Sequence, residues 1–260
     1  MAMDPILSEQ RKQAMRAAGF WSDQTLLDAF SKTVRYDPGR IAVVGYEAAT
    51  NRRTLLTYGE LQQTADRIAA SLLRLGVKPG EVVSYQLPNW WQFVALHLAL
   101  LRIGAVTNPI MPIFRDREME FMLTLAETRV LIVPRRFRDF DHAAMADRLK
   151  VKVPTLEHIV VIGSGDDRDF EAVLNAPGER VEAATAASAD DVVQLLYTSG
   201  TTGEPKGVMH TSNTLLNSVR YFEHRVHLTA NDVVLMASPM AHPTGFLVGL
   251  LLPLYLGGRV

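Results

Sequence analysis

Apolar residues recur at intervals of three and four early in the chain, and this spacing predicts a helix. The residues that share this face are Leu61, Ala65, Ile68, Ala69, Leu72 and Leu75. Gly76 follows as a helix stop and Pro79-Gly80 as a turn. The largely apolar segment 82–87 comes next, between turn signals, and is interpreted as a strand.

The same cycle of strand and helix continues to the end of the sequence. Helices are expected over 90–103, with Asn89 as the N-cap, and over 116–127, 137–149, 211–226 and 245–256. Strands are expected over 105–107, 130–133, 158–162, 192–197 and 233–237. Residues 163–190 have little periodicity and are interpreted as surface loops with one helical turn. This alternation predicts a layered α/β fold with mostly parallel strands flanked by helices.

Composition and charge narrow the possible partners. The 260 residues include 27 Lys and Arg against 28 Asp and Glu, a net charge of −1, so we expect neither nucleic acid nor an anionic membrane as partner. Cysteine is absent, which excludes disulfides, zinc fingers, iron–sulfur sites and a cysteine nucleophile. The longest apolar run, 246–256, is far shorter than a membrane span of about 20 residues. With no secretory signal in the first residues, we expect a cytoplasmic protein.

The segment 195–207, LLYTSGTTGEPKG, carries the clearest chemical signal. Its glycines let backbone N–H groups approach an anion, its hydroxyls donate further hydrogen bonds, and Lys206 adds a positive charge. These groups suit the terminal phosphates of a nucleotide. By composition alone, an ordinary surface loop is an equally good interpretation. The segment is not the P-loop of kinases and GTPases, because Pro205 precedes the lysine and Gly207 follows it.

The order Tyr-Thr-Ser-Gly-Thr-Thr-Gly-Glu-Pro-Lys-Gly closely resembles the phosphate-loop signature of the adenylate-forming superfamily. That family includes acyl-CoA synthetases, luciferases and the adenylation domains of peptide synthetases. Three other segments resemble family motifs in the expected order: LTYGEL at 56–61, the LRIGA…P segment at 101–109, and PMAHPTG at 239–245.

The resemblance implies a two-step reaction. A carboxylate attacks the α-phosphate of Mg-ATP to give an acyl-adenylate and pyrophosphate, and the thiol of coenzyme A then attacks the adenylate. The implied cofactors are ATP, Mg²⁺ and coenzyme A, and no residue of this chain is expected to bind the metal. The residues that the resemblance assigns to the phosphates are Thr198, Ser199, Gly200, Thr201, Thr202, Gly203 and Lys206.

The resemblance also assigns the acid substrate to residues near 240. Met240, His242, Thr244 and Gly245 are implied to contact it, and Lys206 and His242 are the implied catalytic residues. From the residues alone, His242 would be a histidine hydrogen-bonded in a helix-entry turn. The apolar stretch 242–256 indicates a hydrophobic acid of the fatty, cyclic or aromatic kind.

Several family motifs would follow Val260. These are the adenine-, ribose- and Mg-binding motifs, the hinge, the adenylation lysine and the small C-terminal domain. We therefore expect residues 1–260 to be the N-terminal part of the large domain of an acyl-CoA synthetase, inactive by itself. Two alternatives stay open: a non-catalytic module that binds nucleotide or phosphate, and an adenylation domain of another branch. An unrelated NTP hydrolase is disfavoured by Pro205.

Overall fold

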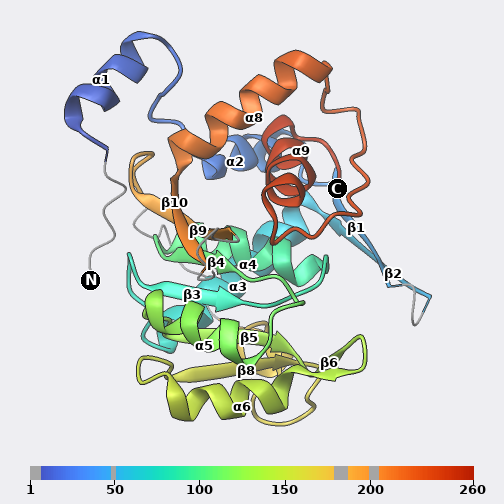
Figure 1. Ribbon diagram of the computed structural model, residues 1–260. Helices are drawn as coiled ribbons and strands as arrows, with labels where there is room; N and C mark the ends of the chain where they lie inside the picture. Colours follow the sequence, from blue (N-terminus) through green and yellow to red (C-terminus); the bar gives the residue numbers. More distant parts are fainter. Residues whose placement is uncertain (1–6, 48–50, 179–186, 199–204) are drawn as a thin grey trace.

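The computed structural model describes residues 7–47, 51–178, 187–198 and 205–260. Within these residues the main sheet has six strands in the order β10-β9-β4-β3-β5-β8 (Figure 1). The strands are β3 (Val82–Tyr85), β4 (Val106–Pro109), β5 (Val130–Pro134), β8 (His158–Ile162), β9 (Val192–Thr198) and β10 (Lys206–Thr211). Neighbouring strands are parallel except β10, which is antiparallel to β9. The predicted α/β fold with mostly parallel strands is confirmed.

Helices cover both faces of this sheet (Figure 1). On one face lie α3 (Tyr58–Arg74) and α4 (Trp91–Arg102), and on the other lie α5 (Asp116–Leu125) and α6 (His142–Lys152). The alternation of side chains along β5 explains the two cores. Val130 and Ile132 belong to the cluster on the α4 face, whereas Leu131 and Val133 belong to the cluster on the α5 and α6 face.

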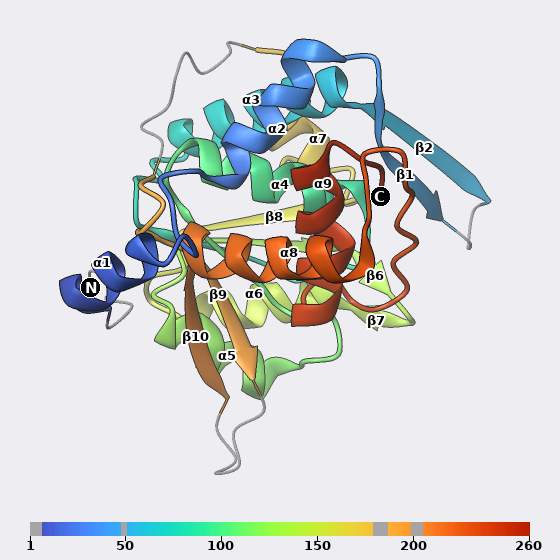
Figure 2. The same ribbon diagram turned by 90° about the horizontal axis from the view of Figure 1, so that it is seen from above.

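The remaining elements surround the α4 side of the sheet (Figure 2). They are α1 (Glu9–Ala17), α2 (Leu26–Tyr36), α7 (Phe170–Val173), α8 (Ser212–Val226), the π-helix η1 (Gly245–Leu251) and α9 (Leu252–Leu256). The predicted helix over 245–256 is therefore present, but its first part is wound as a π-helix. An antiparallel hairpin of β1 (Ile41–Glu47) and β2 (Arg52–Thr57), which the pattern did not predict, lies apart from the main sheet.

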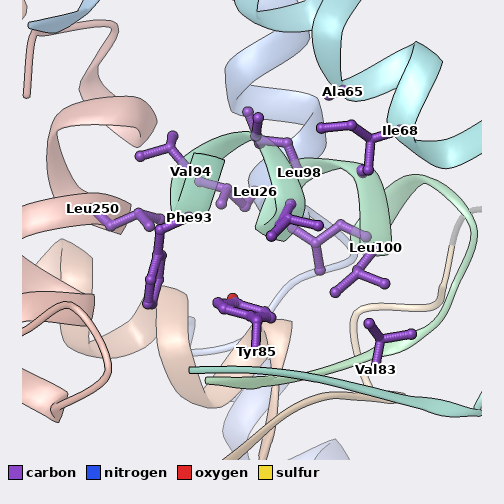
Figure 3. Close-up of a cluster of buried hydrophobic side chains, with 14 of the residues drawn as sticks. Leu26, Ala65, Ile68, Val83, Tyr85, Phe93, Val94, Leu98, Leu100 and Leu250 are labelled. Carbon is purple, nitrogen blue, oxygen red and sulfur yellow. The ribbon is translucent and has the colours of Figure 1, made fainter. Parts of the chain in front are cut away.

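The core is densest around α4 (Figure 3). Every residue from Gln92 to Leu101 is buried. Tyr85 of β3 meets the edge of the Phe93 ring with centroids 4.8 Å apart, and Phe246 of η1 contacts the same ring at 6.5 Å. Phe93 and Leu250 lie at one end of the cluster in Figure 3, and Ala65 and Ile68 of α3 lie at the other. The helix is thus enclosed by β3, α3 and η1.

The LTYGEL segment forms the start of α3. Thr57 is the N-cap, and its hydroxyl accepts a hydrogen bond from the backbone N–H of Glu60 at 3.2 Å. The Glu60 carboxylate in turn accepts from the N–H of Thr57 at 2.8 Å. This reciprocal capping box satisfies two backbone donors that a helix start otherwise leaves unpaired. The motif is therefore explained by helix initiation.

The segment 101–109 also has a structural role. The guanidinium of Arg102, the last residue of α4, pairs with the carboxylate of Asp66 of α3 at 2.5 Å, and both side chains are largely buried. Gly104 follows with φ of +65°, a left-handed conformation that suits glycine at a helix end. The chain then enters β4. This segment fixes α3 against α4 and turns the chain back into the sheet.

Two predicted elements are wrong in part. Residues 137–149 do not form one helix, because β6 (Arg136–Phe137) and β7 (Phe140–Asp141) make a short hairpin before α6. Arg138 and Asp139 have φ of +49° and +60° at its tip, a tight turn that a helix cannot contain. Residues 233–237 form no strand. Val233 has one isolated bridge, to Arg259, so the alternating pattern has no neighbouring strand in the described part of the chain.

Replacing Phe93 by Ala is expected to destabilise the fold strongly. The ring is fully buried between Tyr85 and Phe246, so the change leaves a cavity and costs about 3–5 kcal/mol of the free energy of unfolding. Urea denaturation of the purified chain measures this. Leu235→Ala is the control, because Leu235 is 92% exposed and its loss should matter by no more than about 0.5 kcal/mol. Equal effects of the two changes would contradict the assignment of the core.

Candidate functional site

The glycine- and hydroxyl-rich segment is flanked by the paired strands β9 and β10. Thr198, the last residue of β9, is the cross-strand partner of Lys206, the first residue of β10. Both side chains are exposed. The other residues predicted to contact phosphate lie outside the described residues, and they are Ser199, Gly200, Thr201, Thr202 and Gly203. The structure therefore places the two flanks of the predicted phosphate loop side by side.

The base of this hairpin is fixed in the sheet. Gln194 of β9 pairs with Thr107 of the parallel strand β4, and Tyr197 donates a hydrogen bond from its hydroxyl to the carbonyl of Met122 in α5 at 2.8 Å. Burial raises the pKa of the Tyr197 hydroxyl, which keeps it protonated as a donor. Lys206 thus starts the edge strand of the sheet, opposite a strand that is bonded to both β4 and α5.

Two hollows adjoin the hairpin on its α5 side. One, of about 780 Å³, is lined by Pro205 and by residues of α5 that include Phe121 and Leu125. The other, of about 830 Å³, is lined by Leu125, Tyr197 and Gly207, among others. Neither of these two hollows is lined by the residues predicted to contact the acid. They flank the hairpin rather than join it to the segment around 240.

The segment around 240 is a compact turn that leads into η1. The N–H of His242 donates to the carbonyl of Pro239 at 3.0 Å, and the N–H of Phe246 donates to the carbonyl of His242 at 2.9 Å. Gly245 is required here because a Cβ would lie 2.1 Å from the carbonyl oxygen of Pro239. The turn is thus closed by backbone contacts that a larger residue at 245 would break.

The four predicted acid-contacting residues divide into two groups in this turn. His242 and Thr244 are exposed, and Nδ1 of His242 accepts from the N–H of Thr244 at 3.4 Å. Gly245 is buried, and Met240 is only 5% exposed within the main core. His242 therefore sits in the helix-entry turn that the residues alone suggested, with its ring available to a ligand. The contact of these residues with an acid stays a prediction.

Asn89 does not cap the helix as predicted. Trp90 is the N-cap of α4, and the Asn89 carboxamide reaches across the molecule to the segment before His242. Its Nδ2 donates to the carbonyls of Met236 and Ser238, and its Oδ1 accepts from the N–H of Met240. The prediction was wrong because the local sequence, Asn after Pro, favours a helix cap, whereas the actual hydrogen-bond partners of Asn89 lie about 150 residues away in the sequence.

The buried side chain of Gln86 organises the neighbouring loop. Gln86, just after β3, donates through Nε2 to the carbonyls of Met111 and Phe114, each at 3.0 Å. Its Oε1 therefore accepts from Nδ1 of His142 at 2.8 Å. Burial, with the nearby charge of Arg115, lowers the pKa of His142 to about 4, so its ring is neutral at pH 7. The sequence did not single out either residue, because neither belongs to a local motif.

The described residues contain no group of three or more His, Cys, Asp or Glu side chains placed to hold a metal ion. In that part of the chain, no helix combines the length and apolar character that crossing a bilayer requires.

Comparison with known proteins identifies the family. Residues 30–260 match the AMP-binding enzyme family. The chain belongs to this family. It is 34% identical over its whole length to the medium-chain fatty-acid–CoA ligase of Escherichia coli and covers 45% of that protein. It is also 34% identical, over 89% of its length, to the salicyl-AMP ligase/salicyl-S-ArCP synthetase of Mycobacterium tuberculosis, of which it covers 41%.

The fold is that of a solved member of the same group. The apo structure of MbtA from Mycobacterium smegmatis matches with a TM-score of 0.85 and 32% identity, over 99% of this chain and 47% of that one. The chain thus spans about half the length of the relatives that it matches. The recognition of an adenylate-forming protein from its motifs is confirmed.

Replacing Gly245 by Ala is expected to destabilise the turn before η1. The added methyl would overlap the carbonyl of Pro239, and such overpacking costs about 1–3 kcal/mol of the free energy of unfolding. Thermal unfolding followed by circular dichroism measures the loss. Gly39→Ala is the matched control, because no atom lies within 4 Å of a Cβ built there. An unchanged melting temperature for Gly245→Ala would contradict the close approach.

Proposed function

We propose that the protein activates a hydrophobic carboxylic acid with ATP and joins it to coenzyme A. A carboxylate oxygen attacks the α-phosphorus, the bond from that phosphorus to the bridging oxygen breaks, and pyrophosphate leaves. The thiolate sulfur of coenzyme A then attacks the acyl carbon of the adenylate, and AMP leaves with its oxygen. Residues 1–260 supply the pyrophosphate side of the site and part of the acid pocket, as the N-terminal part of the large domain.

The observation that carries this proposal is the family match over 30–260, which includes the complete phosphate-loop signature. Relatives with similar identity are named for acid–CoA ligation or acid adenylation, among them a naphthoate–CoA ligase of Streptomyces carzinostaticus that is 32% identical. Because these names cover both aliphatic and aromatic acids, they support the reaction type and a hydrophobic acid rather than one particular substrate.

The hairpin β9–β10 would act on the leaving group. Lys206 is exposed at the start of β10, opposite Thr198, where its ammonium group would be free to meet the leaving group. Negative charge builds on pyrophosphate as it departs, so a cation and hydroxyl donors placed there stabilise the transition state more than the ground state. We assign this role to Lys206 and Thr198, together with Ser199, Gly200, Thr201, Thr202 and Gly203.

The turn before η1 would hold the acid. His242 and Thr244 present polar, exposed groups directly before the apolar stretch that begins at the buried Phe246. This arrangement suits a molecule with a carboxylate at one end and a hydrocarbon body, since pockets of this kind combine apolar walls with few polar groups. We assign carboxylate contact to His242 and Thr244, and shaping of the pocket wall to Met240 and Gly245.

ATP and coenzyme A enter this proposal as substrates. The described residues form no protein cage for Mg²⁺, so no step is assigned to the metal. The cytoplasmic location expected from the sequence stays a prediction.

Acid-dependent exchange between ATP and labelled pyrophosphate tests the proposal. The intact protein is expected to catalyse exchange with medium-chain fatty acids or aryl acids, because adenylate formation is reversible until coenzyme A is added. Release of AMP on addition of coenzyme A then reports the second step. Nucleotide binding without exchange for any acid in a broad panel would favour the alternative of a non-catalytic nucleotide-binding module.

The same assay on residues 1–260 alone is expected to show little exchange, because this chain covers 45% of the E. coli ligase. Exchange at the rate of the intact protein would contradict the proposed division of the active site.

Lys206→Ala in the intact protein is expected to slow adenylation. Loss of a charge-assisted hydrogen bond to phosphate costs about 1.5–3 kcal/mol, or roughly 10- to 150-fold in exchange rate. The exchange assay at saturating acid measures it, with Lys32→Ala on the exposed surface of α2 as control. An unchanged rate for Lys206→Ala would remove this residue from the mechanism.

A further inference from the structure

The carboxamide of Asn89 holds a distant backbone segment through three hydrogen bonds. Asn89 lies in the connection between β3 and α4. Both protons of its Nδ2 are used, one donated to the carbonyl of Met236 at 3.1 Å and one to that of Ser238 at 2.8 Å. Its Oδ1 accepts from the N–H of Met240 at 2.8 Å. One side chain thus pairs three backbone groups over residues 236–240.

This segment has few other backbone partners among the described residues. It lies outside any strand, and the backbone pairing with Arg259 stops at Val234, whose N–H donates to the Arg259 carbonyl at 2.9 Å. Leu235 next to it is 92% exposed. Beyond Val234, the Asn89 side chain therefore supplies the hydrogen bonds to the backbone of 236–240 that a neighbouring strand would otherwise supply. The side chain of Met236 packs against Gly249 of η1, where a Cβ would lie 2.3 Å from its Cγ.

The held segment continues directly into the turn that carries the proposed acid contacts. The carbonyl of Pro239 accepts from the N–H of His242, so the position of the His242 backbone depends on where 238–240 lie. A shift of these residues would move the exposed His242 and Thr244 together. Because Asn89 stands at the start of the enclosed helix α4, its own position is set by the core.

We propose that Asn89 is a positioning residue for the acid site. Its carboxamide anchors residues 236–240 to the α4 entry and thereby fixes the turn that presents His242 and Thr244. The inference rests on the proposed function, since it assumes that an acid binds at this turn. Asn89 touches neither ATP nor the acid in this scheme, so its loss should weaken acid binding and leave ATP binding intact.

Two variants of the intact protein test this. Asn89→Ala removes all three hydrogen bonds, and Asn89→Asp keeps an acceptor for the Met240 N–H but sets a carboxylate against two carbonyl oxygens. The matched control is Asn213→Ala on α8. Asn213 also links distant segments, because it accepts from the N–H of Ser22 at 3.0 Å and donates to Asp190 at 2.7 Å. Its partners lie outside the proposed acid site.

Steady-state exchange kinetics give the first readout. Both Asn89 variants are expected to raise the KM for the acid about tenfold and to leave the KM for ATP within about twofold of the wild-type value. Asn213→Ala should leave both KM values near the wild-type ones. A purely structural role of Asn89 would instead lower the melting temperature and the active fraction without changing the KM for the acid, and that result would overturn the proposal.

Hydrogen–deuterium exchange of the same proteins gives a readout that does not depend on activity. The peptide that contains Met240 and His242 is expected to exchange faster in both Asn89 variants and at the wild-type rate in Asn213→Ala. Unchanged exchange in that peptide would overturn the anchoring role, even with an altered KM. If the wild-type protein shows the anchored peptide but no acid-dependent ATP–pyrophosphate exchange, the proposed function fails, and the assignment of an acid site to this turn fails with it.

Discussion

Helix α4 is apolar on all sides, and a helix of this kind must be enclosed on all sides. The sheet, α3 and η1 take up these positions, and the aromatic contacts of Phe93 with Tyr85 and Phe246 lock two of them. Even His97 in this helix is neutral, since burial lowers its pKa to about 3. The enclosure fixes where the connection from β3 enters the helix. Gln86 and Asn89 both lie in that connection. Gln86 holds the loop at 111–114 and Asn89 holds residues 236–240, so the positions of both segments depend on the burial of one helix.

Local signals made much of the fold predictable. The periodicity from Leu61 to Leu72 corresponds to α3, and the apolar runs between turn signals correspond to β3, β5, β8 and β9. Features that depend on distant contacts were not predictable in this way. Asn89 has the local signature of a cap, but its carboxamide is used by backbone groups about 150 residues away. The sequence pattern at 233–237 is that of a strand. A strand also needs a neighbouring segment to pair with, and the pattern of one segment cannot show whether such a neighbour exists.

The motifs that led to the family divide by physical role. Thr57 and Glu60 initiate a helix, Arg102 joins α4 to α3, and Gly245 allows a backbone approach that no other residue permits. These positions serve the fold, although they were noticed as marks of an enzyme family. The chemical expectation depends on a smaller set at the hairpin tip and the turn before η1. The sequence therefore indicated the family through residues whose main role is structural, whereas the positions of the residues predicted to contact the acid depend on tertiary contacts.

The pairing of Thr198 with Lys206 has a thermodynamic consequence for the segment between them. Bringing two chain ends together costs conformational entropy. Here the pairing of β9 with β10 brings the two ends together when the protein folds, before any ligand binds. An anion that binds at the tip does not have to close this ring of backbone itself. More of the intrinsic attraction between phosphate and protein then remains as observed affinity. If the segment binds phosphate as proposed, the antiparallel strand at the edge of an otherwise parallel sheet is the feature that would give this advantage.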